Sequence, residues 1–288
     1  MTTTIVCGGF KGGTGKTSAT CMLGYVLSKD YKVSIIDFDP QANATGFLTA
    51  TYKSVQLGEG FTSLYEALEQ DDLKSAIKKL DDGLDFIPNA KDLSKFTDFV
   101  NRIVGGYEEK RARDFILKMY LDEVKGDYDF VLIDTPPAIY EFTSNALMAS
   151  DYALIIMQTE PDSFLGALHY YDFVMKLNEE IKEHNSEISA LPVNERPPII
   201  EEVKVLGVLP YLQTKNSKID DFILSQAVSA DEENVIKDHI LQSRIYRRER
   251  IKRYRLEGIS SQDHHDKEAQ AMYERVKEEI LEKVMSDE

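Results

Sequence analysis

The chain has 288 residues, and 42% of them are hydrophobic, which suits one large α/β domain or two small ones and argues against wholesale disorder. The formal net charge of −16 excludes a protein coated in positive potential, although it leaves room for a local basic site. The longest apolar runs are short and interrupted by charge, and the N-terminus lacks the progression of a signal peptide, so we expect a cytoplasmic protein without a membrane-spanning helix.

Short apolar runs alternate along the chain with amphipathic stretches of helical period. We predict strands over residues 3–9, 32–39, 83–89, 128–137, 151–160 and 203–212. We predict helices over residues 17–30, 62–80, 111–124, 164–181 and 266–288. Cys7 and Cys21 fall in the first strand and the first helix, form no C-x-x-C pair, and are expected to be buried, reduced thiols.

Continuous apolar strands separated by helices indicate a parallel sheet that is covered on both faces. The predicted fold is therefore α/β, a single doubly wound, mostly parallel sheet, and no linker divides the domain that spans residues 1–288. Residues 183–202 contain three prolines and are predicted to form a long surface loop before the last strand.

A glycine-rich stretch, GGFKGGTGKTS at residues 8–18, follows the first predicted strand and opens the first predicted helix. It matches most of the phosphate-loop pattern G-x-x-x-x-G-K-[ST], but Phe10 stands at the first glycine position and a second lysine, Lys11, follows it. Backbone N–H groups of the glycines are expected to point at phosphate oxygens, with Lys16 at the β- and γ-phosphates and Thr17 on Mg²⁺. The predicted nucleotide-binding residues here are Gly12, Gly13, Thr14, Gly15, Lys16, Thr17 and Ser18.

Three carboxylates follow apolar strands. Asp37 and Asp39 end the strand in VSIIDFDPQANAT (residues 33–45), and Asp134 ends the strand in YDFVLIDTPP (residues 128–137). Ligands of open parallel sheets lie beyond the carboxyl ends of the strands, so these side chains are expected beside the glycine-rich loop. There they can hold Mg²⁺ or polarise a water, although an aspartate at a strand end also suits a turn or a cap.

Four motifs together resemble the ParA/MinD family of deviant Walker ATPases, and most closely the ParA-type partition ATPases of plasmids and chromosomes. The motifs are FKGGTGKTS, IIDFDPQANAT, FVLIDTPP and SDYALIIMQTEPDSFLGAL. The similarity extends from the first strand through VKVLGVLPYLQTKNSKIDD, and the wording DPQANAT is specific to the partition branch. The resemblance implies a P-loop ATPase that binds ATP and Mg²⁺, hydrolyses ATP slowly, and forms a homodimer when ATP is bound.

The resemblance also implies the role of the second lysine. In this family the lysine that matches Lys11 crosses to the ATP of the facing subunit when two monomers enclose two nucleotides. A cation from the partner can stabilise charge at the β/γ bridge in the manner of an arginine finger. A solubilising loop lysine is the alternative interpretation.

The same comparison gives roles to the other site residues. Asp39 matches the residue that positions the hydrolytic water, Asp37 is a supporting carboxylate near the metal, and Asp134 matches the Walker B aspartate. Pro210 and Tyr211 stand where the family contacts the adenine, although an ordinary turn at the end of the strand explains them as well.

One stretch, RIYRRERIKRYR at residues 244–255, is strongly basic and carries seven Lys or Arg against one Glu. Such a stretch can contact DNA phosphates without reading bases, and relatives bind nucleoid DNA non-specifically through basic residues in this part of the chain. A basic helix that pairs with the acidic remainder of the same protein is the alternative. We predict a basic segment over residues 239–257, with the DNA contacts Arg244, Arg247, Arg248, Arg250, Lys252, Arg253 and Arg255.

The function expected from the resemblance is a DNA partition ATPase that is stimulated by a centromere-binding, ParB-like adaptor and located on the nucleoid. The alternative is a MinD-like positioning ATPase at a membrane, which requires a basic amphipathic C-terminal helix, whereas the sequence ends in the acidic stretch YERVKEEILEKVMSDE. Neither the DPQANAT motif nor the basic stretch fits a metabolic P-loop ligase. The sequence does not identify the cargo.

Overall fold

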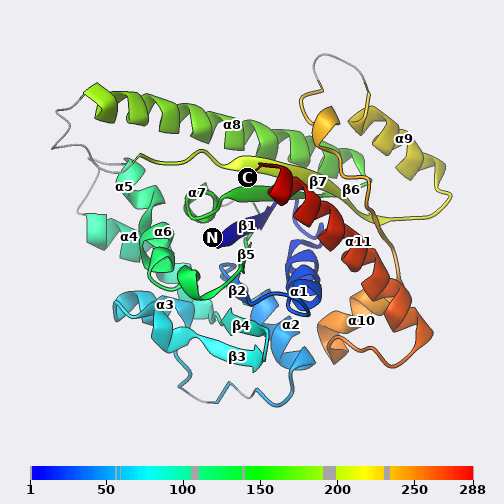
Figure 1. Cartoon of the computed structure of the whole chain (residues 1–288), viewed down its shortest axis with the longest axis horizontal. Helices are drawn as coiled ribbons and strands as arrows, with labels where there is room; N and C mark the ends of the chain where they lie inside the picture. Colours follow the sequence, from blue (N-terminus) through cyan, green and yellow to red (C-terminus); the bar gives the residue numbers. More distant parts are fainter. Residues whose placement is uncertain are drawn as a thin grey trace.

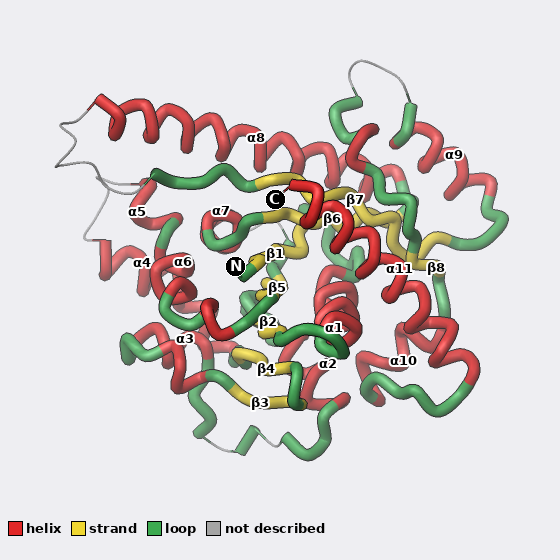
Figure 2. The backbone as a smooth tube through the Cα atoms, viewed as in Figure 1, coloured by secondary structure: helices red, strands yellow, loops and turns green. Residues whose placement is uncertain are grey.

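The computed structural model describes residues 2–55, 57–58, 60–104, 110–137, 140–190, 199–229 and 234–287. Within these residues eight strands form one sheet: β1 (Thr3–Gly8), β2 (Val33–Asp37), β3 (Lys78–Asp81), β4 (Leu84–Ile87), β5 (Phe130–Asp134), β6 (Tyr152–Gln158), β7 (Lys204–Gln213) and β8 (Ile245–Tyr246). Their order is β3-β4-β2-β5-β1-β6-β7-β8, and β3 alone among them runs antiparallel to its neighbour. Figure 2 shows these strands passing through the middle of the molecule.

Helices cover both faces of the sheet (Figure 1). One face packs against α3 (Leu64–Glu69), α4 (Phe96–Val104), α6 (Ile116–Asp122), α7 (Tyr140–Met148) and α8 (Pro161–Ala190). The other face packs against α1 (Lys16–Leu27), α2 (Asn43–Thr51), α10 (Glu249–Glu257) and α11 (His264–Asp287). Two short helices, α5 (Lys110–Asp114) and α9 (Lys218–Ala227), complete the described set.

The two hydrophobic cores follow from the alternation of side chains along the strands. In β1, for example, Val6 belongs to the core under α8, whereas Ile5 and Cys7 belong to the core under α1. Because both faces are covered, β1, β2 and β5 are buried along their whole length. Cys7 and Cys21 are both free and buried, as expected. The prediction of a doubly wound, mostly parallel α/β sheet is confirmed.

The predicted helix over residues 62–80 is wrong in its second half. The chain forms α3, then Asp71 takes a left-handed conformation (φ 56°), a 3₁₀ turn covers Leu73–Ala76, and β3 begins at Lys78. The left-handed residue ends the helical path, and the edge of the sheet at β4 then offers backbone partners to the remaining residues.

The predicted surface loop over residues 183–202 begins too early. Residues 183–190 continue α8, because this part of the stretch contains no proline and Ile188 is buried. Residues 191–198 lie outside the described part of the chain, and residues 199–202 form neither helix nor strand. Asn178 and Asn185 of α8 then hold the returning chain, through hydrogen bonds to the backbone of Val203 and Ile200.

No helix among the described residues is both long enough and apolar enough to cross a membrane.

Candidate nucleotide-binding site and basic surface

Three neighbouring strands end at the site. β5 lies between β1 and β2, and Asp134 is in register with both Cys7 and Asp37. The loop that follows β1 and the two carboxylates that end β2 and β5 therefore meet at one edge of the sheet. The sequence prediction that these motifs come together is borne out by this register.

Two glycines of the loop adopt backbone conformations that other residues rarely take. Gly13 has φ 76° and Gly15 has φ 98°, and α1 begins directly afterwards at Lys16. A Cβ atom on Gly15 would lie 2.2 Å from the ring of Tyr211, so this position excludes a side chain for a second reason. The loop thus points N–H groups and the positive end of α1 at one place, which is an arrangement that binds anions.

Phe10, which replaces the first glycine of the phosphate-loop pattern, anchors the loop on α8. Its ring centroid lies 5.1 Å from that of Tyr170 and 5.6 Å from that of Phe173, in edge-to-face geometry. Tyr170 also fills the space beside Gly8, where a Cβ atom would lie 2.0 Å from its hydroxyl. An aromatic contact therefore holds the start of the loop.

The Lys16 ammonium spans the loop. Its Nζ donates hydrogen bonds to the carbonyl oxygens of Gly9 at 3.0 Å and Lys11 at 3.1 Å. Burial lowers the pKa of Lys16, and the carboxylates of Asp134 and Asp39 oppose that shift. A buried cation beside an anion-binding loop can bind phosphate once it turns from the carbonyls to the ligand.

Asp37 is fully buried and holds the start of α2. Its Oδ2 accepts hydrogen bonds from both the backbone N–H and the hydroxyl of Thr45, each at 2.7 Å. Burial raises the pKa of Asp37 to about 6, and the two hydrogen bonds from Thr45 oppose this shift. Thr45, which the sequence motif contains but to which we assigned no role, is therefore a structural part of the site.

Asp134 is fully buried, and neither of its carboxylate oxygens accepts a hydrogen bond from any described residue. Burial raises its pKa well above the ordinary value, and Asp37 adds to the rise, while the Thr17 hydroxyl and the Lys16 ammonium oppose it. A buried carboxylate that accepts no hydrogen bond is costly, and a bound cation would offset that cost. Asp134, Asp37 and the Thr17 hydroxyl form an all-oxygen donor set, which fits Mg²⁺.

Asp39 lies at the turn that follows β2 and is 5% exposed. Its Oδ1 accepts a hydrogen bond from the N–H of Gln41 at 2.9 Å, and its carbonyl oxygen accepts one from Asn89 Nδ2 at 2.5 Å. The N–H of Asn89 donates to Thr45 Oγ1 at 2.8 Å. Asn89, at the end of β4, thus joins the two halves of this turn, which the sequence did not indicate.

Lys11 forms an ion pair within its own chain. Its Nζ lies 3.0 Å from Oδ2 of Asp162, in the first turn of α8, and the side chains are 41% and 75% exposed. Gly166 of α8 also lies beside the Lys11 backbone, where a Cβ atom would lie 3.4 Å from the Lys11 nitrogen, which is an ordinary contact distance. Asp162 was not predicted as a site residue, since only the fold brings it to Lys11.

Tyr211 and Pro210 are both buried within β7. The Tyr211 ring lies under Gly15, and its hydroxyl lies 2.6 Å from that of Tyr273 in α11. Tyr211 therefore supports the loop from beneath, and the adenine contact of Pro210 and Tyr211 stays a prediction. Sequence could not indicate this, since it depends on Tyr273, which is far along the chain.

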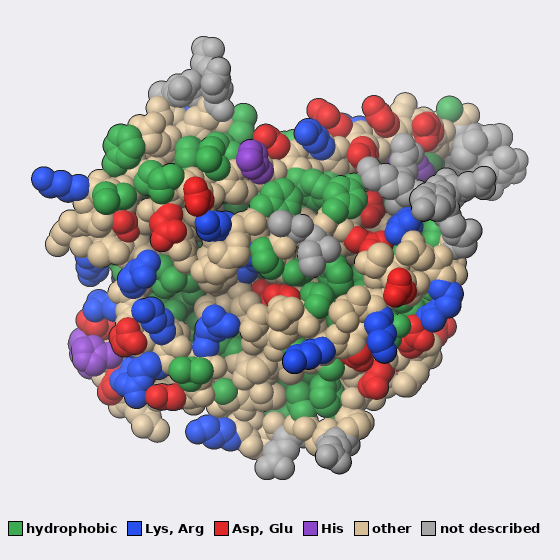
Figure 3. All heavy atoms as spheres, turned by 180° about the vertical axis from the view of Figure 1, so that it is seen from behind, with side chains coloured by type: hydrophobic (Ala, Val, Ile, Leu, Met, Phe, Trp, Pro, Cys, Tyr) green, Lys and Arg blue, Asp and Glu red, His purple; other side chains and the backbone are tan. Residues whose placement is uncertain are grey.

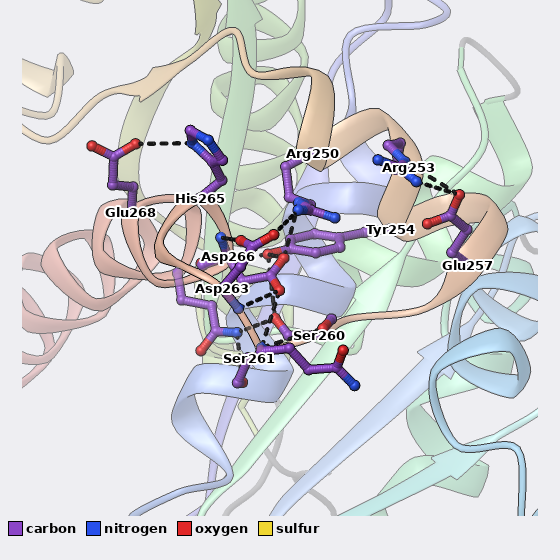
Figure 4. Close-up of polar contacts among 12 residues, drawn as sticks. Arg250, Arg253, Tyr254, Glu257, Ser260, Ser261, Asp263, His265, Asp266 and Glu268 are labelled. Atoms are coloured by element: carbon purple, nitrogen blue, oxygen red, sulfur yellow. Dashed lines mark hydrogen bonds and ion pairs between the residues drawn. The ribbon is translucent and has the colours of Figure 1, made fainter.

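The basic stretch forms β8 and α10, and much of its charge is paired internally. Arg250 is 20% exposed and contacts both Asp263 and Asp266, the second at 3.1 Å from its Nε (Figure 4). Arg253 pairs with Glu257 on the same helix, which Figure 4 also shows. The other internal contacts are Arg248 with Glu268 at 3.6 Å, Lys252 with Glu249 at 3.8 Å, and Arg255 with Asn43 at 3.4 Å.

Three cations of the stretch have no ion pair within the described parts of the chain. Arg244 and Arg247 flank β8, and Arg255 contacts only the neutral side chain of Asn43. Lys215 also lies beside β8, with its Nζ 5.1 Å from the ring centroid of Tyr246. In Figure 3, Lys and Arg side chains gather toward the edge that β8 and α10 occupy in Figure 1.

The comparisons with known proteins agree with this geometry. A family model described as an AAA domain matches residues 2–189. A ParA family protein of Chlamydia pneumoniae is 35% identical over 179 residues, which cover 61% of this chain and 66% of that protein, so the match spans just under two thirds of the relative.

Two solved structures have the same fold. The chain of a plasmid partition protein of Borrelia burgdorferi B31, bound to AMPPNP, is 25% identical, with a TM-score of 0.72 and complete coverage of both chains. A variant of Cyanothece McdA in complex with ATP is 21% identical, with a TM-score of 0.75, covering 97% of this chain and 96% of that one.

Proposed function

The chain belongs to the ParA/MinD-type ATPases of the AAA domain family, and from that premise we propose that it is a DNA partition ATPase whose dimerisation and DNA binding depend on ATP. The observation that carries the nucleotide part is the buried, donor-free carboxylate of Asp134 at the foot of the glycine-rich loop. An anion-binding loop beside a buried carboxylate whose oxygens accept no hydrogen bond from the described residues suits a ligand that brings both phosphates and a cation.

In this proposal the loop and Lys16 bind the ATP phosphates, and Thr17, Asp37 and Asp134 hold Mg²⁺. Mg²⁺ supplies the charge compensation that phosphoryl transfer requires. Asp39 orients the attacking water, and Lys11 leaves Asp162 to reach the nucleotide of a second copy. Slow hydrolysis then makes the dimer a switch rather than a metabolic enzyme, and an adaptor of the ParB type accelerates the reset.

We expect Asp39→Ala to keep ATP-dependent dimers while turnover falls by roughly 10²- to 10⁴-fold, because the loop and metal residues remain in place. The measurement is phosphate release together with light scattering in the presence of ATP and Mg²⁺. Loss of the dimer would instead show that Asp39 is structural, through its contacts to Gln41 and Asn89.

The proposed DNA surface consists of the unpaired cations around β8, Arg244 and Arg247, with Lys215 beside them. Paired cations contribute less, because a carboxylate already neutralises them in part. In a chain of net charge −16, these cations offer DNA a local attractive region, while the acidic remainder attracts a basic adaptor.

The test of the function is binding to a random-sequence duplex with no nucleotide, with ADP, and with ATP plus Mg²⁺, across a salt titration. We expect much tighter binding with ATP than with ADP or without nucleotide, and a steep fall of affinity with salt, because each phosphate contact releases counterions. Equal binding in all three states would remove the nucleotide switch, and absence of binding in every state would refute the DNA function.

Within that assay, we expect Arg247→Gln to lower DNA affinity about threefold to tenfold and to make the salt slope shallower by roughly one. Arg253→Gln removes the same charge from a position paired with Glu257, and should lower affinity about twofold or less. Equal losses in the two variants would place the DNA surface on α10 rather than around β8.

The membrane-positioning alternative finds less support in the fold. In α11 the apolar residues Val276, Ile280 and Val284 are buried in the core shared with α1, so they are not offered to a lipid surface. The helix also carries many acidic side chains, which anionic lipid repels. Binding of the ATP form to anionic vesicles, without binding to DNA, would favour this alternative.

A further inference from the structure

The basic helix α10 rests on α2, the helix that follows the Asp39 turn. Gly258, which ends α10, approaches so closely that a Cβ atom would lie 2.3 Å from the carbonyl oxygen of Ala50, and it has φ 87°. The N–H of Ile259 donates to Thr51 Oγ1 at 3.1 Å. These contacts fix the end of α10 to the end of α2.

A second contact joins α10 to the start of α2. Arg255 Nη2 donates to Asn43 Oδ1 at 3.4 Å, and Asn43 is the first residue of α2. The guanidinium of Arg255, although it belongs to the basic stretch, is thus directed at the turn between Asp39 and Thr45. Asn43 carries no charge, so this contact leaves the net charge of the region unchanged.

The first turn of α2 is in turn held by the nucleotide site. Asp37 accepts two hydrogen bonds from Thr45 on one oxygen, and the residue before the helix, Ala42, has a left-handed backbone (φ 53°). A cation held by Asp37 would act on the same carboxylate that Thr45 contacts. The occupancy of the site therefore bears directly on how the start of α2 is held.

On its far side, α10 is fastened to α11. Asp266 is 1% exposed, accepts a hydrogen bond from the Tyr254 hydroxyl at 3.0 Å, and pairs with Arg250. Figure 4 shows Arg250, Tyr254, Asp263 and Asp266 converging between the two helices. These contacts join α10 to the start of α11.

We propose that Arg255 is a positioning residue, not a phosphate contact: through Asn43 it ties the basic helix to α2 and to Asp37, so that the nucleotide state sets how the basic surface meets DNA. This inference rests on the proposed function. It assigns one of the seven predicted DNA contacts to coupling between the two sites. Such coupling requires that both sites act on one shared element, and α2 is that element.

The experiment measures the switch ratio, defined as duplex affinity with ATP and Mg²⁺ divided by duplex affinity with ADP and Mg²⁺. The variants are Arg255→Gln, Asn43→Ala and the double variant, and Arg253→Gln is the control that loses the same charge from the same helix. We expect each single variant to lower the switch ratio about threefold to tenfold, and the double variant to lower it no further. Arg253→Gln should leave the ratio unchanged.

Because Asn43 is uncharged, the Asn43→Ala variant separates coupling through Asn43 from a direct contact of Arg255 with phosphate. If Arg255 simply contacted phosphate, Arg255→Gln would lower affinity in both nucleotide states and reduce the salt slope, and Asn43→Ala would leave both unchanged. That result, or additive effects in the double variant, would overturn the coupling. A wild-type protein that binds no DNA with ATP would refute the proposed function itself, so the two failures are distinguishable.

Discussion

Replacing Asp134 by asparagine is expected to raise the free energy of unfolding of the nucleotide-free protein at pH 7 by about 1–3 kcal/mol, because it removes a carboxyl group whose burial raises its pKa well above the ordinary value. The same change should abolish the stabilisation that ATP and Mg²⁺ give to the wild-type protein, since a ligand stabilises only the form that binds it. Chemical denaturation with and without ATP and Mg²⁺ measures both effects.

The pH dependence of stability gives an independent check on Asp134→Asn. The pKa of Asp37 is raised to about 6 and that of Asp134 is raised well above its ordinary value, so both groups bind protons more tightly in the folded protein. Their contribution to stability is therefore complete below the ordinary aspartate pKa. It is lost as pH rises through about 6 for Asp37, and through its own raised pKa for Asp134. Between pH 4 and 7, the variant should lose less stability than the wild type.

A lower stability of Asp134→Asn at neutral pH would contradict this account, because it would mean that the ionised carboxylate is compensated in the nucleotide-free protein. Asp151→Asn is a suitable control, since the Asp151 carboxylate accepts a hydrogen bond from the N–H of Thr4 at 2.7 Å. Neutralising a partnered carboxylate should destabilise the protein, in the opposite direction from Asp134.

The second large effect is expected from Lys11→Ala. The variant should bind ADP as a monomer with normal affinity, fail to dimerise with ATP, and lose about two orders of magnitude or more in turnover, as when a charge-stabilising finger is removed. The Asp39→Ala background is suited to the dimer measurement by light scattering, because it preserves ATP. If the Lys11→Ala variant still dimerises with ATP and keeps its turnover, Lys11 does not act on the nucleotide of the facing subunit.

Asp162→Asn removes the other member of the Lys11 ion pair, so it is the matched variant for Lys11→Ala. The ion pair with Lys11 is largely exposed, so it contributes at most about 1 kcal/mol. Its removal frees Lys11 without deleting it, and we expect ATP-dependent dimerisation to become stronger by up to about fivefold. Opposite effects of the two variants would show that the ion pair competes with the dimer.

The sequence allowed most of the central sheet to be predicted, because β1, β2, β5, β6 and β7 are apolar and end at glycine, proline or polar residues. The edge strands were not predicted. β3 lies inside a stretch of helical period, and β8 has only two residues. For short edge strands the neighbouring backbone decides the structure, and periodicity carries little information.

The site was predictable wherever a motif fixed both residue type and spacing, as for Lys16, Asp37 and Asp134. Contacts that join distant segments were not. The pairing of Lys11 with Asp162, the hydrogen bond of Asn89 to the Asp39 turn, and the burial of Tyr211 all depend on how helices and strands pack. The basic stretch illustrates the same limit, since composition marked seven cations but not the carboxylates that neutralise some of them.

The support of Gly15 by Tyr211, which is itself hydrogen-bonded to Tyr273, has a consequence for biosynthesis. The phosphate loop leaves the ribosome well before the two tyrosines that support it, Tyr211 and Tyr273. β1 also pairs with β5 and β6, whose residues are translated more than a hundred positions later. We therefore expect the loop of a nascent chain to lack its native packing until α11 has emerged.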